Sequence, residues 1–461
     1  MGRRRTRTGV AVAAGMLLVG VAAVPARADT PVDCVTQDLI DAINDSNAGA
    51  NDHILVLTSY CVYTLTDANG QLPMVTQPLV IHGNHATIRR DPAATTNFRI
   101  FEVGGTSLTM DTLTVMNGNA TGDLGGGLKL TTSSGSLTAT NVNFQGNTAA
   151  VGGAISAFSG GSVSLTGGTV NDNRADSEGG GIASAGAIML DSVAVTGNRS
   201  ISDSGGLILL GNQPATITNS TIDHNTAKNF GGGITYQGSG PLSVTGASIA
   251  DNRVTDSGAG GGGVFFEPEP GGTLMITGST VSGNTVTGFT ANDGESNRGG
   301  GIYVREGQAT LDSTTVRGNQ LIGAFGQGAG IAAEGFFAAG TLTLQNGTTL
   351  LANLASGRYS QGGGLYTDNS FNPVTVAVNA SHIDTNKVTG TGSAAAGIYN
   401  NGGTYSFTTS SVNNNTAPLA PAPGGVYTTV AITSVDAGTT FTGNTPTNCV
   451  FSPAPVTGCV G

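Results

Sequence analysis

Residues 179–198 read GGGIASAGAIMLDSVAVTGN, and this stretch contains the pattern that decides the fold. A glycine run ends in an aliphatic residue, a short variable stretch follows, and an alternating apolar and polar run then closes on asparagine. Residues 231–252, GGGITYQGSGPLSVTGASIADN, have the same order, and further copies extend over about residues 105–447. The closing residues of the twelve copies are Asn119, Asn147, Asn173, Asn198, Asn225, Asn252, Asn284, Asn319, Asn353, Asn386, Asn415 and Asn444.

The spacing of the copies predicts a solenoid. Successive closing asparagines lie 25 to 35 residues apart, too short for an independent domain, so each copy must bury its apolar face against its neighbours. The short runs alternate apolar residues with Thr or Ser, and no helix of any length fits between them. We therefore predict an all-β fold, a single parallel β-helix of about twelve coils. A β-propeller is the competing repeat fold, but its blades usually bring Trp, which is absent here.

In such a stack, equivalent residues of successive coils form columns. Asparagines in one column hydrogen-bond from coil to coil as a ladder, so we expect them to be structural. The glycine runs mark bends at which a side chain would clash or φ is positive. The predicted ladder includes Asn147, Asn173, Asn198, Asn225, Asn252, Asn284 and Asn319.

Composition and charge limit the function classes. Gly makes up 74 of the 461 residues and charged residues only 10%, which excludes a coiled coil or a charged disordered chain. Five of the 18 basic residues precede residue 29 and no acid does, so the remainder carries 13 basic and 29 acidic groups, a net charge of -16. Such a surface repels nucleic acid and anionic membranes. No motif for a metal or cofactor is found.

The N-terminus predicts export. Arg3 to Arg7 form a basic region, Val10 to Val24 a weakly apolar one, and Ala26-Arg27-Ala28 a small-x-small cleavage signal. We predict a signal peptide in residues 1–28 and a secreted protein. No other apolar run is long enough for a membrane span. We expect a monomer.

The four cysteines suit an oxidising compartment and lie near the chain ends. Cys34 and Cys61 follow the predicted cleavage site, and Cys449 and Cys459 lie near the C-terminus. Four cysteines allow three pairings, of which pairing within each end is the simplest. Neither pair has the spacing of a metal site.

The repeats resemble a known family. Gly152-Gly153-Ala154-Ile155, with Phe144-Gln145-Gly146-Asn147, is similar to the GGAI and FxxN signatures of polymorphic-outer-membrane-type repeats, and the whole resembles a bacterial right-handed parallel β-helix protein. The segment from Cys34 is similar to the cysteine-led cap that opens such proteins. The resemblance implies a pectate-lyase-like fold and an exported or surface location, and it fixes no activity, since relatives include adhesins and passenger domains.

The domain organisation follows from these assignments. Residues 29–104 form an N-terminal cap and first irregular coils, 105–447 the repeats, and 448–461 a C-terminal cap. A short helix N-capped by Thr36, with Leu39, Ile40 and Ile43 on its apolar face, covers the first coil and so protects an open strand edge.

Function is predicted on the outer face of the later coils. Each glycine run ends in an aliphatic residue that points inward, so the residue that follows it points outward. The residue two places further along the strand points to the same outer face. The first row contains Phe265, Tyr303, Ala332, Tyr366, Tyr399 and Tyr427, and the second Glu267, Arg305, Glu334, Asp368, Asn401 and Thr429. Aromatic faces edged by carboxylates and an arginine suit a neutral or basic polysaccharide. Packing of the aromatic residues on the sheet, with Arg305 offsetting its acidic neighbours, is the structural alternative.

The predicted ligand-binding residues are Phe265, Glu267, Tyr303, Arg305, Glu334, Tyr366, Asp368 and Tyr399. Spacings of 32 to 35 between Asn252 and Asn386 indicate projecting loops. The candidates to overhang this face are Phe289, Asp293, Glu295, Arg298, Phe336 and Phe337.

We favour a non-catalytic extracellular binding protein, with a polysaccharide or a cell-surface molecule as its partner. The alternative is a polysaccharide lyase or glycoside hydrolase that uses Glu334, Asp368 and Arg305, because in-register carboxylates on adjacent coils lie about 5 Å apart, as in a retaining pair. Lys129, Lys228 and Lys387 each stand alone, so no lyase-type base is indicated. A plain adhesive rod with a protein partner is the third possibility.

Overall fold

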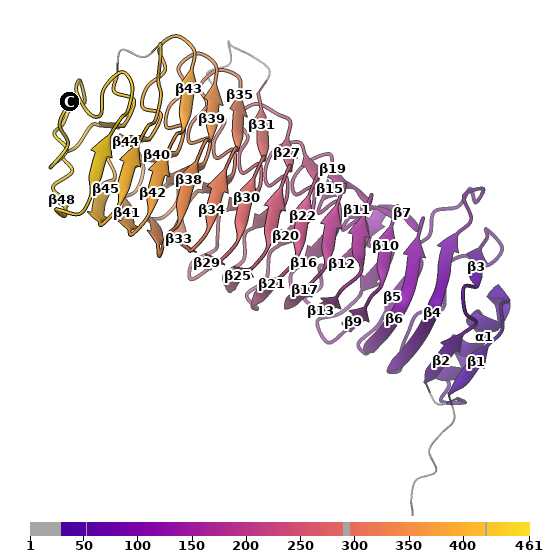
Figure 1. Ribbon diagram of the computed structural model, residues 1–461. Helices are drawn as coiled ribbons and strands as arrows, with labels where there is room; N and C mark the ends of the chain where they lie inside the picture. Colours follow the sequence, from indigo (N-terminus) through magenta and orange to yellow (C-terminus); the bar gives the residue numbers. More distant parts are fainter. Residues whose placement is uncertain (1–28, 52, 289–295, 420–421) are drawn as a thin grey trace, which may run out of the picture.

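The protein is a long stack of β-coils. It is described from a computed structural model that covers residues 29–51, 53–288, 296–419 and 422–461. The predicted signal peptide and the loop candidates Phe289, Asp293 and Glu295 lie outside the described residues. Figure 1 shows the coils stacked along one axis, with helix α1 (Thr36–Asn47) at the N-terminal end and the C-terminus at the other end.

One coil illustrates how the sequence pattern becomes structure. The glycine run 179–181 leads into β16 (Ile182–Ser184), a turn leads to β17 (Ile188–Asp191), and a bend at Ser192 leads to β18 (Ala194–Thr196). Asn198 then precedes β19 (Arg199–Ser200), after which the next glycine pair begins. Each strand pairs in parallel with its equivalent in the neighbouring coils.

The strands form three parallel sheets. Sheet 1 takes up two strands of most coils: β1 (Thr30–Val32), β2 (Ile54–Leu57), β3 (Val62–Leu65), β4 (Leu79–Arg90), β6 (Ser107–Met116), β9 (Ser136–Thr140), β10 (Asn143–Gln145), β13 (Ser162–Thr166), β14 (Thr169–Asn171), β17, β18, β21 (Ala215–Thr218), β22 (Thr221–Asp223), β25 (Pro241–Thr245), β26 (Ser248–Ala250), β29 (Thr273–Thr277), β30 (Thr280–Ser282), β33 (Gly307–Asp312), β34 (Thr315–Arg317), β37 (Gly340–Gln345), β38 (Thr349–Leu351), β41 (Val374–Asn379), β42 (His382–Asp384), β45 (Thr404–Thr408), β46 (Ser411–Asn413), β48 (Ser434–Val435) and β49 (Thr440–Thr442).

Most coils contribute one strand to each of the other two sheets. Sheet 2 contains β5 (Phe101–Val103), β8 (Leu128–Leu130), β12 (Ile155–Ala157), β16, β20 (Leu207–Leu209), β24 (Ile234–Tyr236), β28 (Val264–Phe266), β32 (Ile302–Val304), β36 (Ile331–Glu334), β40 (Leu365–Asp368), β44 (Ile398–Asn401) and β47 (Val426–Thr428). Sheet 3 contains β7 (Asn119–Leu124), β11 (Thr148–Val151), β15 (Arg174–Glu178), β19, β23 (Thr226–Ala227), β27 (Arg253–Val254), β31 (Thr285–Thr287), β35 (Gln320–Ile322), β39 (Leu354–Ser356) and β43 (Lys387–Thr389).

The stack is longer than the repeats alone predict. Strand β4 pairs with both β2 and β6, so coils before residue 105 share the sheet 1 register of the later ones. The described residues therefore form about 14 turns, because the irregular first coils add to the twelve repeats.

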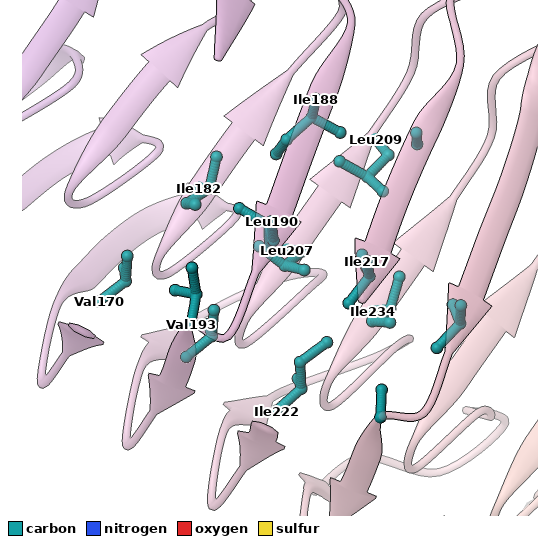
Figure 2. Packing of buried hydrophobic residues seen from close by; sticks show 14 of the residues in the cluster. Val170, Ile182, Ile188, Leu190, Val193, Leu207, Leu209, Ile217, Ile222 and Ile234 are labelled. Carbon is teal, nitrogen blue, oxygen red and sulfur yellow. The ribbon is translucent and has the colours of Figure 1, made fainter. Parts of the chain in front are cut away.

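One main apolar column fills the interior between the sheets, and a smaller one lies along sheet 3, where it includes Val254, Val286 and Leu321. Figure 2 shows Ile182, Leu190, Leu207, Ile217 and Ile222 of successive coils meeting between the sheets, and all five are buried. A single coil would leave its inward apolar residues open to water above and below it. Only the stacking of neighbouring coils buries them. The alternation of apolar and polar residues thus becomes a shared core rather than separate domain cores.

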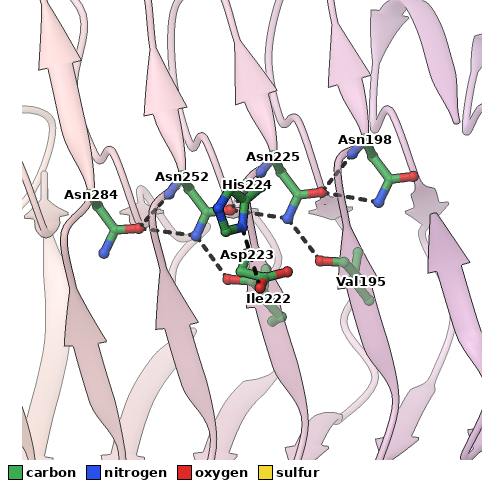
Figure 3. Close-up of polar contacts among 8 residues, drawn as sticks. All are labelled: Val195, Asn198, Ile222, Asp223, His224, Asn225, Asn252 and Asn284. Atoms are coloured by element: carbon green, nitrogen blue, oxygen red, sulfur yellow. Dashed lines mark hydrogen bonds and ion pairs between the residues drawn. The ribbon is translucent and has the colours of Figure 1, made fainter. Parts of the chain in front are cut away.

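The asparagine ladder is present, as the repeat spacing predicts. Figure 3 shows Asn198, Asn225, Asn252 and Asn284 in one column. The Asn225 backbone and side-chain N–H groups both donate to Asn252 Oδ1 at 3.0 Å, and Asn225 Nδ2 also donates to the Val195 carbonyl at 2.9 Å. The column of buried asparagines continues over Asn147, Asn173, Asn198, Asn225, Asn252, Asn284, Asn319, Asn353, Asn386, Asn415 and Asn444.

One of the twelve closing asparagines lies outside the ladder. Asn119 lies in β7, where its side chain contacts Asn97 and Thr121 near the surface. The preceding residue takes the ladder position, because the Gly118 amide donates to Asn147 Oδ1 at 2.9 Å.

The residue before each ladder asparagine has a left-handed backbone conformation. Gly197 and Gly318 have φ values of 65° and 62°, which glycine adopts without strain. Thr385 occupies the same place with a φ of 57°. The turn therefore recurs even where the sequence offers a β-branched residue.

Both ends of the stack are closed. Leu39 and Ile43 of α1 are fully buried against the first coil, and Ile40 is partly buried. Thr36 is not the N-cap: Val35 is, without a side-chain hydrogen bond, while the Thr36 hydroxyl exchanges hydrogen bonds with the Thr64 backbone. The disulfides Cys34–Cys61 and Cys449–Cys459 join the cysteines within each end.

None of the helices in the described part of the chain is long and apolar enough to cross a membrane.

Candidate functional site

The aromatic row predicted on the outer face is in register on consecutive strands of sheet 2. Phe265 pairs with Tyr303, and Tyr366 pairs with Tyr399, which in turn pairs with Tyr427. These side chains point away from the main core, since Phe265, Tyr303 and Tyr366 belong to a separate apolar cluster.

The expectation that the row is exposed is wrong. Phe265, Tyr303 and Tyr366 are 1%, 4% and 3% exposed, and only Tyr399 and Tyr427 are partly accessible. The cause is the residue directly before each glycine run, because these residues form a further parallel ladder beside sheet 2. Phe230 of this ladder stacks on Phe265 with ring centroids 4.5 Å apart.

The same ladder contains Gly260, where the structure leaves no room for a side chain. A Cβ atom on Gly260 would lie 2.5 Å from Cδ1 of Tyr303, so the Tyr303 ring occupies the space that a side chain would need. The recess along sheet 2 is therefore filled by the protein's own side chains.

The polar row is also in register, and its members bind one another. Glu334 pairs with Asp368, which pairs with Asn401. The Tyr303 hydroxyl donates to Glu334 Oε2 at 2.7 Å, and Arg298 forms an ion pair with Glu334 Oε1. Burial raises the pKa of Glu334, while the charge of Arg298 and the Tyr303 hydroxyl favour its ionised form.

These contacts bear on the alternative catalytic pair. Glu334 is 5% exposed and enclosed by Arg298 and Tyr303. Asp368 accepts hydrogen bonds from the Ser370 amide at 2.9 Å and from Asn401 Nδ2 at 3.1 Å. Glu334 cannot reach a substrate without leaving its buried partners, so the geometry gives this carboxylate a structural role.

Arg305 offsets an acidic neighbour, as the structural alternative expects. Its Nη1 atom lies 2.6 Å from Glu267 Oε1, and Gln237 Nε2 donates to the other Glu267 oxygen at 3.0 Å. The Arg305 guanidinium also lies over the Phe336 ring, 3.9 Å from its centroid. Arg305 thus joins the polar row to the projecting aromatic residues.

A groove of about 760 Å³ lies beside this row, where successive turns lead from sheet 2 to sheet 1. The turn after β28, residues 267–272, and the turn after β36, residues 335–339, are long, whereas the turn after β32 has only residues 305–306. Pro268 packs on Gly307, at which a Cβ atom would lie 2.5 Å from Pro268 Cγ. The groove lies between the two long turns and above the short one.

Two phenylalanines project beside the groove. Phe337 and Phe371 are 71% and 70% exposed, and both rings meet Phe336 edge to face, at 4.6 and 5.0 Å between centroids. Phe337 lines the groove, whereas Phe371, in the next turn, does not. The Phe337 backbone is held in place because its amide and that of Ala338 both donate to Glu306 Oε2 at 2.8 Å.

Among the described residues that line the groove, Glu267 is the one member of the predicted ligand-binding set. Sequence reasoning missed Glu269, Glu306 and the flanking Pro268 and Pro270. A signal was present, because the longer repeat spacing indicated projecting turns and Phe337 was a candidate to overhang the face. Which turn remains short was not readable from the pattern.

The described residues contain no group of three or more His, Cys, Asp or Glu side chains that could hold a metal ion.

Comparison with known proteins bears on the fold. The model of the family described as "Right handed beta helix region" matches residues 126–298. The fold is a right-handed parallel β-helix. No curated protein and no solved structure gives a significant match. A β-helix accommodates surface binding as well as pectate-lyase-like chemistry, so the fold does not assign an activity.

Proposed function

We propose that this β-helix protein is secreted and binds an extracellular carbohydrate, without catalysis, in the groove between the turns 267–272 and 335–339. The observation that carries the proposal is Phe337, a ring that is 71% exposed and fixed at the groove wall. An exposed ring held in one place costs little ordering entropy on binding.

The chemistry of the groove suits a sugar. Aromatic rings contact the apolar faces of pyranose rings, while carboxylates accept hydrogen bonds from hydroxyl groups. Phe337 and Pro270 supply apolar surface, and Glu269, which is exposed, supplies an accessible acceptor. The volume of about 760 Å³ lies within the range of small-molecule sites.

Secretion is supported by the N-terminal sequence and by the disulfides. The basic and apolar regions of residues 1–28 have the order of a signal peptide. The disulfides Cys34–Cys61 and Cys449–Cys459 persist in oxidising compartments. The similarity to polymorphic-outer-membrane-type repeats also favours an exported protein.

The test compares two phenylalanines that match in type and exposure. Binding of the mature protein to a panel of polysaccharides is measured by pull-down and by affinity electrophoresis, for the wild type, Phe337→Ala and Phe371→Ala. We expect Phe337→Ala to weaken binding roughly tenfold, since an aromatic contact contributes about 1.4 kcal/mol. Phe371→Ala should leave binding unchanged, because Phe371 lies outside the groove.

Equal behaviour of the two variants, or no binding to any member of the panel, would contradict the proposal. Circular dichroism of both variants checks that the β-helix is intact. Release of reducing ends or unsaturated products from the same panel would contradict the non-catalytic part of the proposal. That activity would then be tested against Glu334→Gln and Asp368→Asn.

A further inference from the structure

The charge of the groove is one-sided. Glu267, Glu269 and Glu306 line it, and its described lining contains no Lys, Arg or His. Arg305, a cation beside the groove, is held between the Glu267 carboxylate and the Phe336 ring face, and its guanidinium also lies over one face of the Phe337 ring, 5.5 Å from the centroid. Arg305 therefore neutralises Glu267 and leaves the charges of Glu269 and Glu306.

The two remaining carboxylates differ in their surroundings. Glu306 is 7% exposed, and its Oε2 atom accepts hydrogen bonds from the backbone amides of Phe337 and Ala338, which fixes the position of the carboxylate. Glu269 is exposed at the tip of the turn 267–272. One negative charge is thus rigid at the groove floor and one is accessible at its rim.

An aromatic ring beside carboxylates is a receptor for ammonium groups. The face of a phenylalanine attracts a cation, and the attraction increases where water is partly excluded. Phe337 lies in the segment whose backbone amides Glu306 binds, so the ring and the buried charge belong to one unit. An anionic ligand would be repelled by the same groups.

A basic peptide fits this groove less well than an amino sugar does. Extended peptides commonly bind by adding a strand to a free sheet edge. The groove is formed by turns, and the sheet 2 strands beside it, β28, β32 and β36, are already paired on both sides. The groove therefore offers side-chain carboxylates and a ring face rather than a backbone ladder.

From these observations we infer that the groove ligand is a polysaccharide with free amino groups, such as a glucosamine polymer, whose ammonium groups lie against Phe337 and Glu269, above the buried charge of Glu306. This inference rests on the proposed function, because it names the sugar class that the same groove takes. The amine distinguishes this ligand from neutral and from acidic polysaccharides.

The experiment uses oligosaccharides of equal length that differ only in the amine. Titration calorimetry of the mature protein is carried out with glucosamine hexamer and with its fully N-acetylated form, at low salt and a pH at which the amines are protonated. We expect the amino form to bind at least tenfold more tightly, and its affinity to fall as salt is added.

Two charge variants test the position of the effect. Glu269→Gln should weaken binding of the amino hexamer about three- to tenfold and leave that of the acetylated hexamer unchanged. Asp45→Asn, which removes one exposed charge on α1 at the far end of the stack, is the matched control and should change neither.

Equal affinity for the two hexamers, or equal effects of Glu269→Gln and Asp45→Asn, would overturn the inference while leaving the proposed function to be judged by Phe337→Ala. Tighter binding of an oligolysine peptide than of the amino hexamer, lost in Glu269→Gln, would also overturn it. If Phe337→Ala binds both hexamers like the wild type, the proposed function itself fails.

Discussion

Replacement of Asn252 by alanine removes one rung from the middle of the asparagine ladder. Asn252 is fully buried, and its side chain takes part in four hydrogen bonds. Its Oδ1 atom accepts two from Asn225, and its Nδ2 atom donates to the Ile222 carbonyl at 2.8 Å and to Asn284 Oδ1 at 3.0 Å. The substitution leaves the Ile222 carbonyl and the Asn225 amide without these partners in a buried place.

The expected cost follows from this count. A buried hydrogen bond contributes about 1 kcal/mol net, so the loss of the rung destabilises the adjoining coils by roughly 4 kcal/mol. Solenoid stability is a sum of repeat and interface terms, and the effect should therefore be local. In hydrogen exchange, about 4 kcal/mol corresponds to an increase of nearly three powers of ten in the exchange rate.

The assay is hydrogen exchange with mass spectrometry on peptides that span residues 219–230 and 280–290. The control is Asn212→Ala, an exposed asparagine in the turn before β21 whose side chain contacts only Gln213 among described residues. That variant should change stability by no more than about 0.5 kcal/mol. If Asn252→Ala raises exchange near Asn225 no more than Asn212→Ala does, the ladder does not stabilise the stack in the way described.

Two further predictions concern the backbone and a charge. Thr385→Gly should increase protection of residues 382–389 by about 1 kcal/mol, because it relieves a β-branched residue at a φ of 57°, and decreased protection would contradict this. Burial opposes ionisation of Asp123, but hydrogen bonds from the Leu124 amide, Lys129 and Arg99 outweigh it and lower its pKa from 3.8 to about 2. Because the folded pKa is the lower one, the stabilisation is present above about pH 4 and is lost as the pH falls through about 2. An NMR titration of the Asp123 carboxyl group should show this midpoint, and it should rise in Lys129→Met; a wild-type midpoint near 3.8 would contradict the assignment.

Much of the fold was predictable because a solenoid is built from local repeats. The recurrence of Asn198, Asn225 and Asn252 at similar spacing sets the coil length, and equal coils stack in register. Asn119 shows the limit of this reasoning. Asn119 lies one position beyond the ladder site. Gly118 occupies that site, and its backbone amide donates to Asn147 Oδ1.

The functional face was predictable only in part. Alternation placed Tyr303 and Tyr366 on the outside of sheet 2, and the structure has them there. Residues of another ladder reach the same recess: Arg298 binds Glu334, the partner of the Tyr303 hydroxyl, and Gln327 donates to the Tyr366 hydroxyl at 3.0 Å. A strand pattern gives the direction of a side chain, but not what covers it from a different part of the coil.

The sequence by itself determined the coil, the inward and outward residues of each strand and the column of asparagines, because these depend on spacing within a single repeat. Tertiary structure alone decided that the aromatic row is covered and that a short turn between two long ones forms a groove with Phe337 at its wall and Phe371 outside it. The physical reason is that the exposure of a side chain depends on the lengths of the turns in the neighbouring coils. Turns of different length form a groove only when the coils are stacked.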